Sequence, residues 1–394
     1  FRRVLFRSLG VQPHEYAAVA WSFAYFFCVL SSYYILRPVR DAMAISSGPD
    51  TIPYLFMGTF VVMMLATPVF GWVVARFPRR AFLPWVYAFF VANIVLFCAV
   101  FTLVGERGGE QVWLGRLFFV WLSVFNLFVV SVFWSFMADI YTREEGRRLF
   151  GLITAGGSMG ALLGGTVTSL LVVQIGFQNL LLLAALVLSL AILCIRQLRR
   201  WVVQEHEDDL ATTVESEQAL GGSSFSGITH VLGSRYFMAI AAASVIASLL
   251  GTALYMFVAQ LIEEAIPAAD QRTQFFSNMN IAQNFIALVA QMFLVKQVVA
   301  RYGIGISLAL MPLLSVLGFA LLAMDPVLGV AAVLTVLRRA LGFGFTKPST
   351  DMLYSVVSAE DKYKTKNFID TAVYRAGDVV GTWSVKLMMG FGVA

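Results

Sequence analysis

The feature that most constrains this chain is a series of apolar runs, each close to the roughly 20 residues that a helix needs to cross a bilayer. Eleven such runs occur, at residues 16–36, 53–74, 82–104, 112–136, 149–173, 177–195, 237–261, 275–295, 304–324, 326–345 and 368–389. A backbone in lipid must pair its own polar groups, and a run of this length does so as an α-helix. The sequence therefore predicts an all-α membrane protein.

The composition supports this prediction and excludes several classes of protein. Hydrophobic residues make up 59% of the 394 residues and charged residues 13%, whereas soluble domains have about 45–50% and about 25%. So much apolar surface excludes a soluble enzyme and a nucleic-acid-binding domain. An excess of Lys and Arg on cytoplasmic loops accounts for the net charge of +5 without a nucleic-acid partner.

Sequence motifs for a metal, a cofactor or nucleotide hydrolysis are missing. The three cysteines, Cys28, Cys98 and Cys194, lie in apolar runs and form no Cys-x-x-Cys motif, and the three histidines form no cluster at ligand spacing. The sequence contains no Gly-x4-Gly-Lys-[Ser/Thr] loop, so ATP hydrolysis is not expected. We predict no metal site, no cofactor and no enzymatic activity.

One long polar stretch divides the apolar runs into a group of six and a group of five. Residues 197–235 contain six acidic side chains followed by Gly-Gly-Ser-Ser, which is typical of a solvated linker. We predict an N-terminal six-helix bundle at residues 1–196, a cytoplasmic linker at 197–235 and a C-terminal bundle at 236–394 with five helices present. The last helix of the second bundle is expected to be missing from this chain.

The loops alternate in charge along the chain. The N-terminus and the loops after the even-numbered runs are rich in Arg and Lys, whereas the opposite loops include the acidic residues Glu263, Glu264 and Asp270. By the positive-inside rule, the N-terminus and the linker lie in the cytoplasm. We predict a monomeric, multi-pass protein of a bacterial inner membrane.

The two groups of runs share a short loop sequence. Val-Val-Ala-Arg occurs at residues 73–76 and again at 298–301, and the first copy lies within Gly-Trp-Val-Val-Ala-Arg-Phe-Pro-Arg-Arg at 71–80. This string resembles the loop signature of the major facilitator superfamily, with Ala75 and Pro78 departing from it. The resemblance implies two parallel six-helix bundles with a binding site between them, although basic inner loops look alike in unrelated membrane proteins too. The loop residues assigned to gating are Gly71, Arg76, Arg79, Arg80 and Arg301.

Charged side chains within the apolar runs predict a cationic binding site. A cation at the centre of a spanning helix costs roughly 2.5–3.5 kcal/mol on insertion scales, so several of them are best explained by a water-filled cavity that holds an anion. Guanidinium groups match the geometry of phosphate and carboxylate. For the charges that end the first run, the alternative is that they extend to the membrane interface. The candidate substrate-binding residues, which include neighbouring aromatic side chains and one asparagine, are Tyr33, Tyr34, Arg37, Arg40, Asp41, Asn126, Trp134, Arg339, Lys347, Asp351 and Arg375.

A ridge of small residues runs along the fifth apolar run. Gly156, Gly160 and Gly164 are spaced four apart, so they lie on one face of a helix and allow a second helix to approach closely. We assign these glycines to helix packing.

Three short strings resemble the nucleotide transporter family, the ATP:ADP antiporters of plastids and intracellular bacteria. They are Tyr-Tyr-Ile-Leu-Arg-Pro-Val-Arg-Asp at 33–41, Phe-Trp-Ser-Phe-Met-Ala-Asp-Ile at 133–140 and Lys-Thr-Lys-Asn-Phe-Ile-Asp at 364–370. The family's carboxylate in the fourth helix falls near Asn126, and its lysine in the tenth helix falls at Thr350, one turn from Lys347. The resemblance implies the fold and a cation in the first helix.

The leading hypothesis is a secondary transporter that exchanges an anionic, phosphorylated metabolite such as a nucleotide. In this hypothesis one pocket is lined by Arg37, Arg40, Arg339 and Lys347. The two halves of the protein change conformation only when a bound anion neutralises the positive charge of this pocket. One alternative is a proton-coupled symporter or exporter, which needs a buried carboxylate of raised pKa. Another alternative is a membrane regulator that transports nothing.

Overall fold

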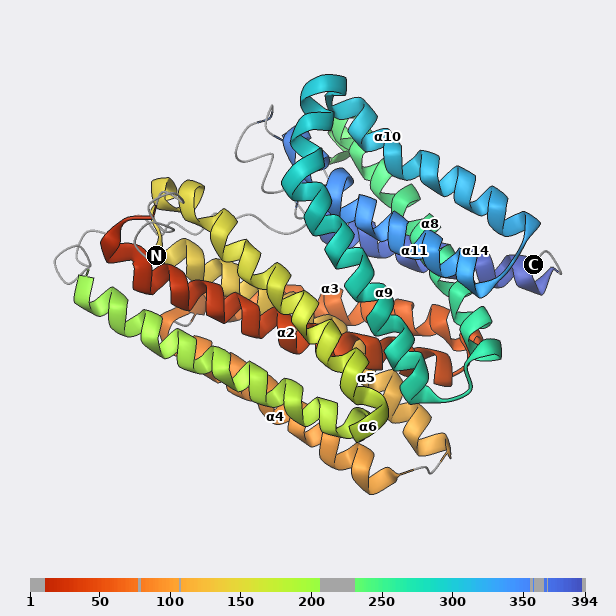
Figure 1. The fold of residues 1–394 in the computed structure, drawn as a ribbon, viewed down its shortest axis with the longest axis horizontal. Coiled ribbons are helices and arrows are strands. Elements are labelled where there is room, and N and C mark those ends of the chain that lie inside the picture. Colours follow the sequence, from red (N-terminus) through yellow and green to blue (C-terminus); the bar gives the residue numbers. More distant parts are fainter. Residues whose placement is uncertain are drawn as a thin grey trace. The chain divides into compact units, whose positions relative to one another are not determined.

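The computed structural model describes residues 11–76, 79–105, 108–205, 231–354, 357, 365–366 and 368–391. Within these ranges every regular element is helical (Figure 1). Eight of the described helical stretches are long and apolar enough to cross a membrane.

The first half of the chain folds into long helices joined by short turns. Gly176, with a φ of 74°, interrupts the longest of them, and glycine adopts this backbone conformation without the Cβ strain of other residues. The fifth and sixth apolar runs therefore form two helices on either side of Gly176. The elements are η1 (Pro13–Glu15), α2 (Tyr16–Ser46), η2 (Pro49–Thr51), α3 (Ile52–Arg76), α4 (Arg79–Val104), α5 (Gly108–Ile140) and α6 (Arg143–Glu205).

The second half repeats this pattern with three π-helical turns added. Gly303, with a φ of 80°, divides the eighth run from the ninth. The side chain of Gln291 in one π-helical turn donates a hydrogen bond of 2.8 Å to the carbonyl oxygen of Phe343 in another. The elements are α8 (Arg235–Ala265), η4 (Ala290–Leu294) between α9 (Ala269–Val289) and α10 (Val295–Met324), η5 (Gly342–Thr346) between α11 (Leu328–Leu341) and α12 (Lys347–Leu353), and η7 (Ile369–Val373) before α14 (Tyr374–Gly390).

The chain forms two compact units, and α2, α3 and α5 each contribute residues to both. Unit 1 comprises Phe1–Arg40, Val69–Leu114 and Trp121–Leu220, and unit 2 comprises Asp41–Pro68, Gly115–Val120 and Gly221–Ala394. Helix α6 continues to Glu205, past the predicted start of the linker, and residues 206–230 lie outside the described residues. The domain boundaries given above stay a prediction.

Unit 1 depends on a close approach between α6 and α2. A Cβ atom built at Gly156 would lie 2.5 Å from the backbone carbonyl oxygen of Phe23. Cβ atoms at Gly160 and Gly164 would meet the carbonyl oxygens of Phe27 and Ser31, each one turn further along α2. Real Cβ atoms essentially never come within 3.0 Å of such an atom. The glycine ridge therefore lies directly against the α2 backbone.

Buried tyrosines connect three helices in the core of unit 1. The hydroxyl of Tyr25 in α2 donates to the hydroxyl of Tyr87 in α4 at 2.6 Å, and Tyr87 donates to the carbonyl oxygen of Val129 in α5 at 2.8 Å. The ring of Phe133 lies 4.8 Å from the Tyr25 ring. Helix α4 also runs along α6, where Cys98 donates to a backbone carbonyl oxygen at 3.3 Å (Figure 1).

Unit 2 packs the turn between α2 and α3 against helices from the second half of the chain. Ile45 and Ile52 belong to the same buried cluster as Leu254 and Tyr255 of α8 and Phe276 of α9. Helix α14 lies along α8, and α11 lies along α9 (Figure 1). These contacts fix the helices that carry the charged residues of the second half.

We predict that Gly160→Ala destabilises the protein by about 1–3 kcal/mol, the usual cost of overpacking, because the new Cβ meets the Phe27 carbonyl oxygen. Gly151→Ala, in the same helix but with nothing within 4 Å of its Cβ, is the matched control. It should leave stability unchanged or raise it, because alanine is the better helix former. Thermal unfolding of the detergent-solubilised protein measures both, and equal midpoints for the two variants would contradict the packing argument.

Candidate substrate-binding residues

The cations of the first span lie toward the end of α2. Arg37 and Arg40 are half-buried, and Asp41 is fully buried. The guanidinium carbon of Arg37 lies 5.6 Å from the centroid of the Tyr34 ring, within the range of a cation–π contact. The Tyr33 and Tyr34 rings contact each other edge to face at 5.3 Å. Helix α2 thus combines two guanidinium groups with a pair of tyrosines.

The two candidates in α5 have different surroundings. The Trp134 ring packs against three phenylalanines, with centroid distances of 5.1 Å to Phe133 and 5.5 Å to Phe26 and Phe150. This environment is that of a packed aromatic side chain in unit 1. Asn126, near which the resemblance to the nucleotide transporters places a carboxylate, is half-buried in the same helix.

Lys347, at the start of α12, is paired with carboxylates. Its ammonium nitrogen lies 2.5 Å from the Asp370 carboxylate and 3.7 Å from the Asp351 carboxylate, and Lys366 contacts Asp351 at 2.8 Å. The Lys347 side chain is 47% exposed within the chain. An anion that binds Lys347 must therefore compete with two aspartates.

Three further cations of the second half, Arg339, Arg375 and Lys386, differ in their surroundings. Arg375 of α14 contacts Asp378 at 3.2 Å, and Arg339 of α11 is half-buried. Lys386 lies 4.4 Å from the centroid of the Tyr54 ring and donates to a backbone carbonyl oxygen at 3.0 Å. An aromatic ring and a carbonyl oxygen therefore compensate the charge of Lys386, and the Asp378 carboxylate compensates that of Arg375.

The loop-signature residues lie in α3, α4 and α10. Gly71 and Arg76 lie in α3, and Arg79 and Arg80 begin α4, although the side chains of these four lie outside the described residues. Arg301 is exposed in α10, with its guanidinium carbon 5.5 Å from the centroid of the Tyr302 ring.

Comparison with known proteins identifies the superfamily. The model of the Major Facilitator Superfamily matches residues 21–382. The chain belongs to the major facilitator superfamily. The predicted fold class and the resemblance to the superfamily are confirmed, and this member is a multi-pass secondary transporter of a small solute rather than an enzyme.

A curated relative and several solved structures are similar to this chain at low sequence identity. "ADP,ATP carrier protein 2" of Chlamydia pneumoniae is 21% identical to this transporter over 94% of the chain and 82% of the relative. A bacterial homologue of the iron transporter ferroportin has a TM-score of 0.64 at 12% identity, covering 95% of this chain and 91% of that one. The nucleoside transporter NupG has a TM-score of 0.60 at 16% identity, covering 96% and 92%. The structural similarities establish the fold, whereas the substrate has to be argued from residues.

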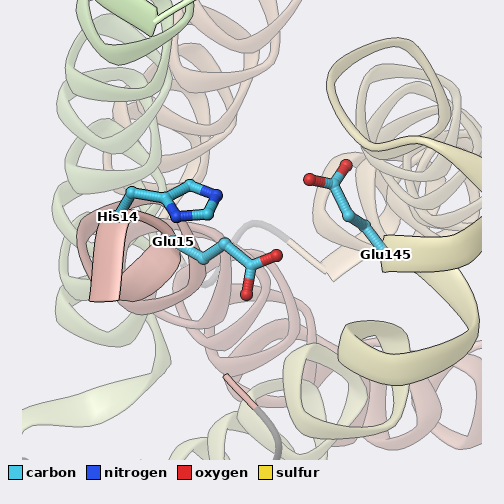
Figure 2. Close-up of side chains that lie close together, drawn as sticks. All are labelled: His14, Glu15 and Glu145. Atoms are coloured by element: carbon cyan, nitrogen blue, oxygen red, sulfur yellow. The ribbon is translucent and has the colours of Figure 1, made fainter. Parts of the chain in front are cut away.

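Three potential metal ligands gather where α2 begins, but most of their oxygens have other roles. Figure 2 shows His14 and Glu15 facing Glu145 from the start of α6. The Glu15 carboxylate accepts hydrogen bonds from Arg148 at 2.5 Å and from the backbone nitrogen of Gln12 at 2.7 Å. Glu145 accepts from the backbone nitrogen and the hydroxyl of Thr142. The cluster fits a contact between helix termini better than a metal site.

A buried tyrosine completes this contact between helix termini. Tyr141 lies just after α5, and its hydroxyl shares a hydrogen bond of 2.9 Å with Ser22. Burial raises the pKa of the Tyr141 phenol, and the negative charges of Glu145 and Glu15 add to this effect. Tyr141 therefore remains neutral at physiological pH and connects α5 to α2.

Arg338 and Ser248 are buried polar residues of unit 2 that are not among the predicted site residues. Arg338 is more deeply buried than its neighbour Arg339, and its spacing from buried Ala331, Leu334 and Thr335 follows one helix face. This helical spacing is the feature of the sequence from which the burial of Arg338 could have been predicted. Ser248 of α8 contacts Asp378 of α14, and no sequence pattern marks a serine for such a contact.

We predict that Arg148→Met lowers the thermal midpoint markedly, because it leaves the buried Glu15 carboxylate without its cation, a loss of about 1–3 kcal/mol or more. Arg199→Met removes an exposed cation from the same helix and should have little effect. Added Zn²⁺ or Mn²⁺ should leave the wild-type midpoint unchanged, since an ion that binds the folded state raises it. A clear rise on adding either ion would identify the cluster as a metal site instead.

Proposed function

We propose that this transporter exchanges an anionic, phosphorylated metabolite, such as a nucleotide, by alternating access. The observation that carries the proposal is the α2 site: half-buried Arg37 beside the Tyr34 ring, one turn before Arg40. The similarity to "ADP,ATP carrier protein 2" supports it over 94% of the chain.

The physical argument starts from the cost of keeping guanidinium groups within a membrane. Two such groups on one helix face cost several kcal/mol unless water, a carboxylate or a bound anion compensates them. A phosphate accepts paired hydrogen bonds from a guanidinium group, and an adjacent aromatic ring provides a stacking surface for a nucleobase. A nucleotide satisfies both features at once.

Charge neutralisation accounts for exchange rather than one-way transport. If the cationic site must be neutralised before the protein changes conformation, the empty protein returns slowly and a second anion has to bind. We assign Arg37 and Arg40 to the anion. Arg339, Lys347 and Arg375 are proposed as further anion ligands, with Asp370 and Asp351 as competitors at Lys347. We further propose that the protein is a monomer in a bacterial inner membrane, with its N-terminus in the cytoplasm.

A second candidate function, proton-coupled transport, rests on Asp378. This carboxylate is only 6% exposed, and burial disfavours a charged carboxylate. Its contact with Arg375 at 3.2 Å has the opposite effect, so we favour anion exchange.

The test is uptake of labelled ATP, ADP and other anions into liposomes containing the purified protein, either preloaded or empty. We predict that uptake requires internal nucleotide and that Arg37→Gln lowers it about tenfold or more, because hydrogen bonds to charged groups contribute about 1.5–3 kcal/mol. Arg37→Lys should retain activity only if the contact is a point charge rather than a paired hydrogen bond.

The matched control is Arg199→Gln, which removes an exposed arginine at the end of α6 and should transport like the wild type. Uptake into empty liposomes under an imposed pH gradient, unchanged by Arg37→Gln, would overturn anion exchange in favour of proton coupling.

A further inference from the structure

Residues 41–68, which we call the α2–α3 hairpin, come from the first half of the chain but pack with the second half. They comprise the end of α2, the short helix η2 and the first part of α3, and they belong to unit 2. Ile45 and Ile52 are fully buried in one apolar cluster with residues of α8, α9 and α11. The Phe56 ring of α3 lies 5.8 Å from the Tyr255 ring of α8. Helices distant in the sequence therefore hold the apolar side of the hairpin.

Lys386 of α14 contacts the hairpin through its charge. Its ammonium nitrogen lies 4.4 Å from the centroid of the Tyr54 ring and 5.5 Å from that of the Trp383 ring. The same nitrogen donates a hydrogen bond of 3.0 Å to the Asp50 carbonyl oxygen, across 336 residues of sequence. The Tyr54 and Trp383 rings contact each other edge to face at 5.1 Å. Since a ring face attracts an ammonium group within about 6 Å of its centroid, Lys386 joins α14 to the hairpin.

Arg272 contacts the same hairpin from α9. Its side chain is buried and donates a hydrogen bond of 3.4 Å to the Ser46 hydroxyl at the end of α2. It also donates to the carbonyl oxygens of Ile266 at 2.6 Å and Glu263 at 3.5 Å. Water can replace a hydroxyl or carbonyl acceptor. The contacts of Arg272 and Lys386 with the hairpin can therefore break and form again.

A proline lies near each point where the helices of the hairpin pass from unit 1 to unit 2. Pro38 lies in α2 within one turn of the boundary after Arg40, and Pro68 of α3 is the last residue of the hairpin. Proline has no backbone N–H group and removes one hydrogen bond from the interior of a helix. A helix bends most readily at such a position. The hairpin thus has a point of weakness at both of its ends.

We propose that the α2–α3 hairpin is a gate hinged at Pro38 and Pro68, and that Lys386 and Arg272 are the latch that keeps it closed. A transporter of this superfamily opens its binding site to one side of the membrane at a time, so contacts between the two halves of the chain must break in each cycle. The inference goes beyond the proposed function and is independent of the solute, because neither latch cation is among the proposed anion ligands.

The experiment measures how fast a water-soluble maleimide labels the thiol introduced by Ile52→Cys in the purified full chain in lipid nanodiscs. Ile52 is fully buried, so this thiol reacts only when the hairpin opens. In the Ile52→Cys parent, Lys386→Met and Tyr54→Leu should each speed labelling severalfold or more, because each removes one partner of the cation–π contact. Tyr54→Phe keeps the ring face and should label like the parent.

Two further substitutions test the rest of the gate. Arg272→Met should also speed labelling severalfold, and the partly exposed Lys386 and Tyr54 carry the test if this buried position does not tolerate the change. Pro68→Ala restores a backbone N–H group to α3 and stiffens the hinge, so it should slow labelling severalfold.

Controls separate gate opening from a general loosening of the protein. Lys296→Gln removes an exposed lysine from α10 and should leave the labelling rate unchanged. The native thiols of Cys98 and Cys194 are buried in unit 1. Mass spectrometry of the labelled peptides should show that none of the variants speeds the labelling of these native thiols.

Four results would overturn the inference. Labelling at the parent rate in both Lys386→Met and Tyr54→Leu would show that their contact does not hold the hairpin closed. Faster labelling of the native thiols in these variants would indicate a loosened protein rather than an open gate. An increase in Lys296→Gln equal to that in Lys386→Met would indicate an effect of net charge. An unchanged or faster rate in Pro68→Ala would exclude the hinge.

Discussion

The structure depends on how closely helix backbones approach each other. In a bilayer, burial of apolar surface does not by itself drive helices together. Lipid chains solvate leucine and phenylalanine as well as another helix does, so helices associate through packing and polar contacts. In unit 1 this packing is the contact of the α6 glycine ridge with the carbonyl oxygens of α2. In unit 2, Gly377 and Gly381 bring α14 against α8 in the same way. Helix α2 carries Arg37 and Arg40, and α14 carries Arg375, so both glycine contacts position cations.

The cations themselves show how a membrane protein compensates charge. Lys347 and Arg375 have aspartate partners at 2.5 Å and 3.2 Å. Arg338 uses a carbonyl oxygen and a hydroxyl, and Lys386 uses aromatic rings and a carbonyl oxygen. Charge compensation of this kind gives some of these cations a structural role. The half-buried guanidinium group of Arg37, 5.6 Å from the centroid of the Tyr34 ring, is the one on which the proposed function rests.

The same distinction separates ligand sites from helix contacts at the start of the chain. His14, Glu15 and Glu145 have the residue types of a metal site, yet Arg148 and the backbone nitrogen of Gln12 already donate hydrogen bonds to the two Glu15 oxygens. Residue type alone therefore overstates binding capacity, because a carboxylate that caps a helix or neutralises an arginine has to give up those contacts, or share its oxygens, to bind an ion. The hydrogen-bond partners decide the assignment.

The sequence by itself determined the membrane-spanning helices, because the length of an apolar run and the need to pair backbone groups are local properties. Each of the eleven runs lies within described helix, except for the first two residues of the run at 326–345. Gly176 separates the fifth run from the sixth, and Gly303 separates the eighth from the ninth. The sequence also marked the glycine ridge and the cation-bearing helix faces, since helical spacing is local too.

Only the tertiary structure decided which cations have partners. The contact of Ser248 with Asp378 spans 130 residues of sequence, and that of Lys347 with Asp370 joins two different helices. Both depend on which helix lies alongside which and at what distance. That choice is made by the packing of many side chains at once, so neither the spacing nor the composition of a single helix contains it.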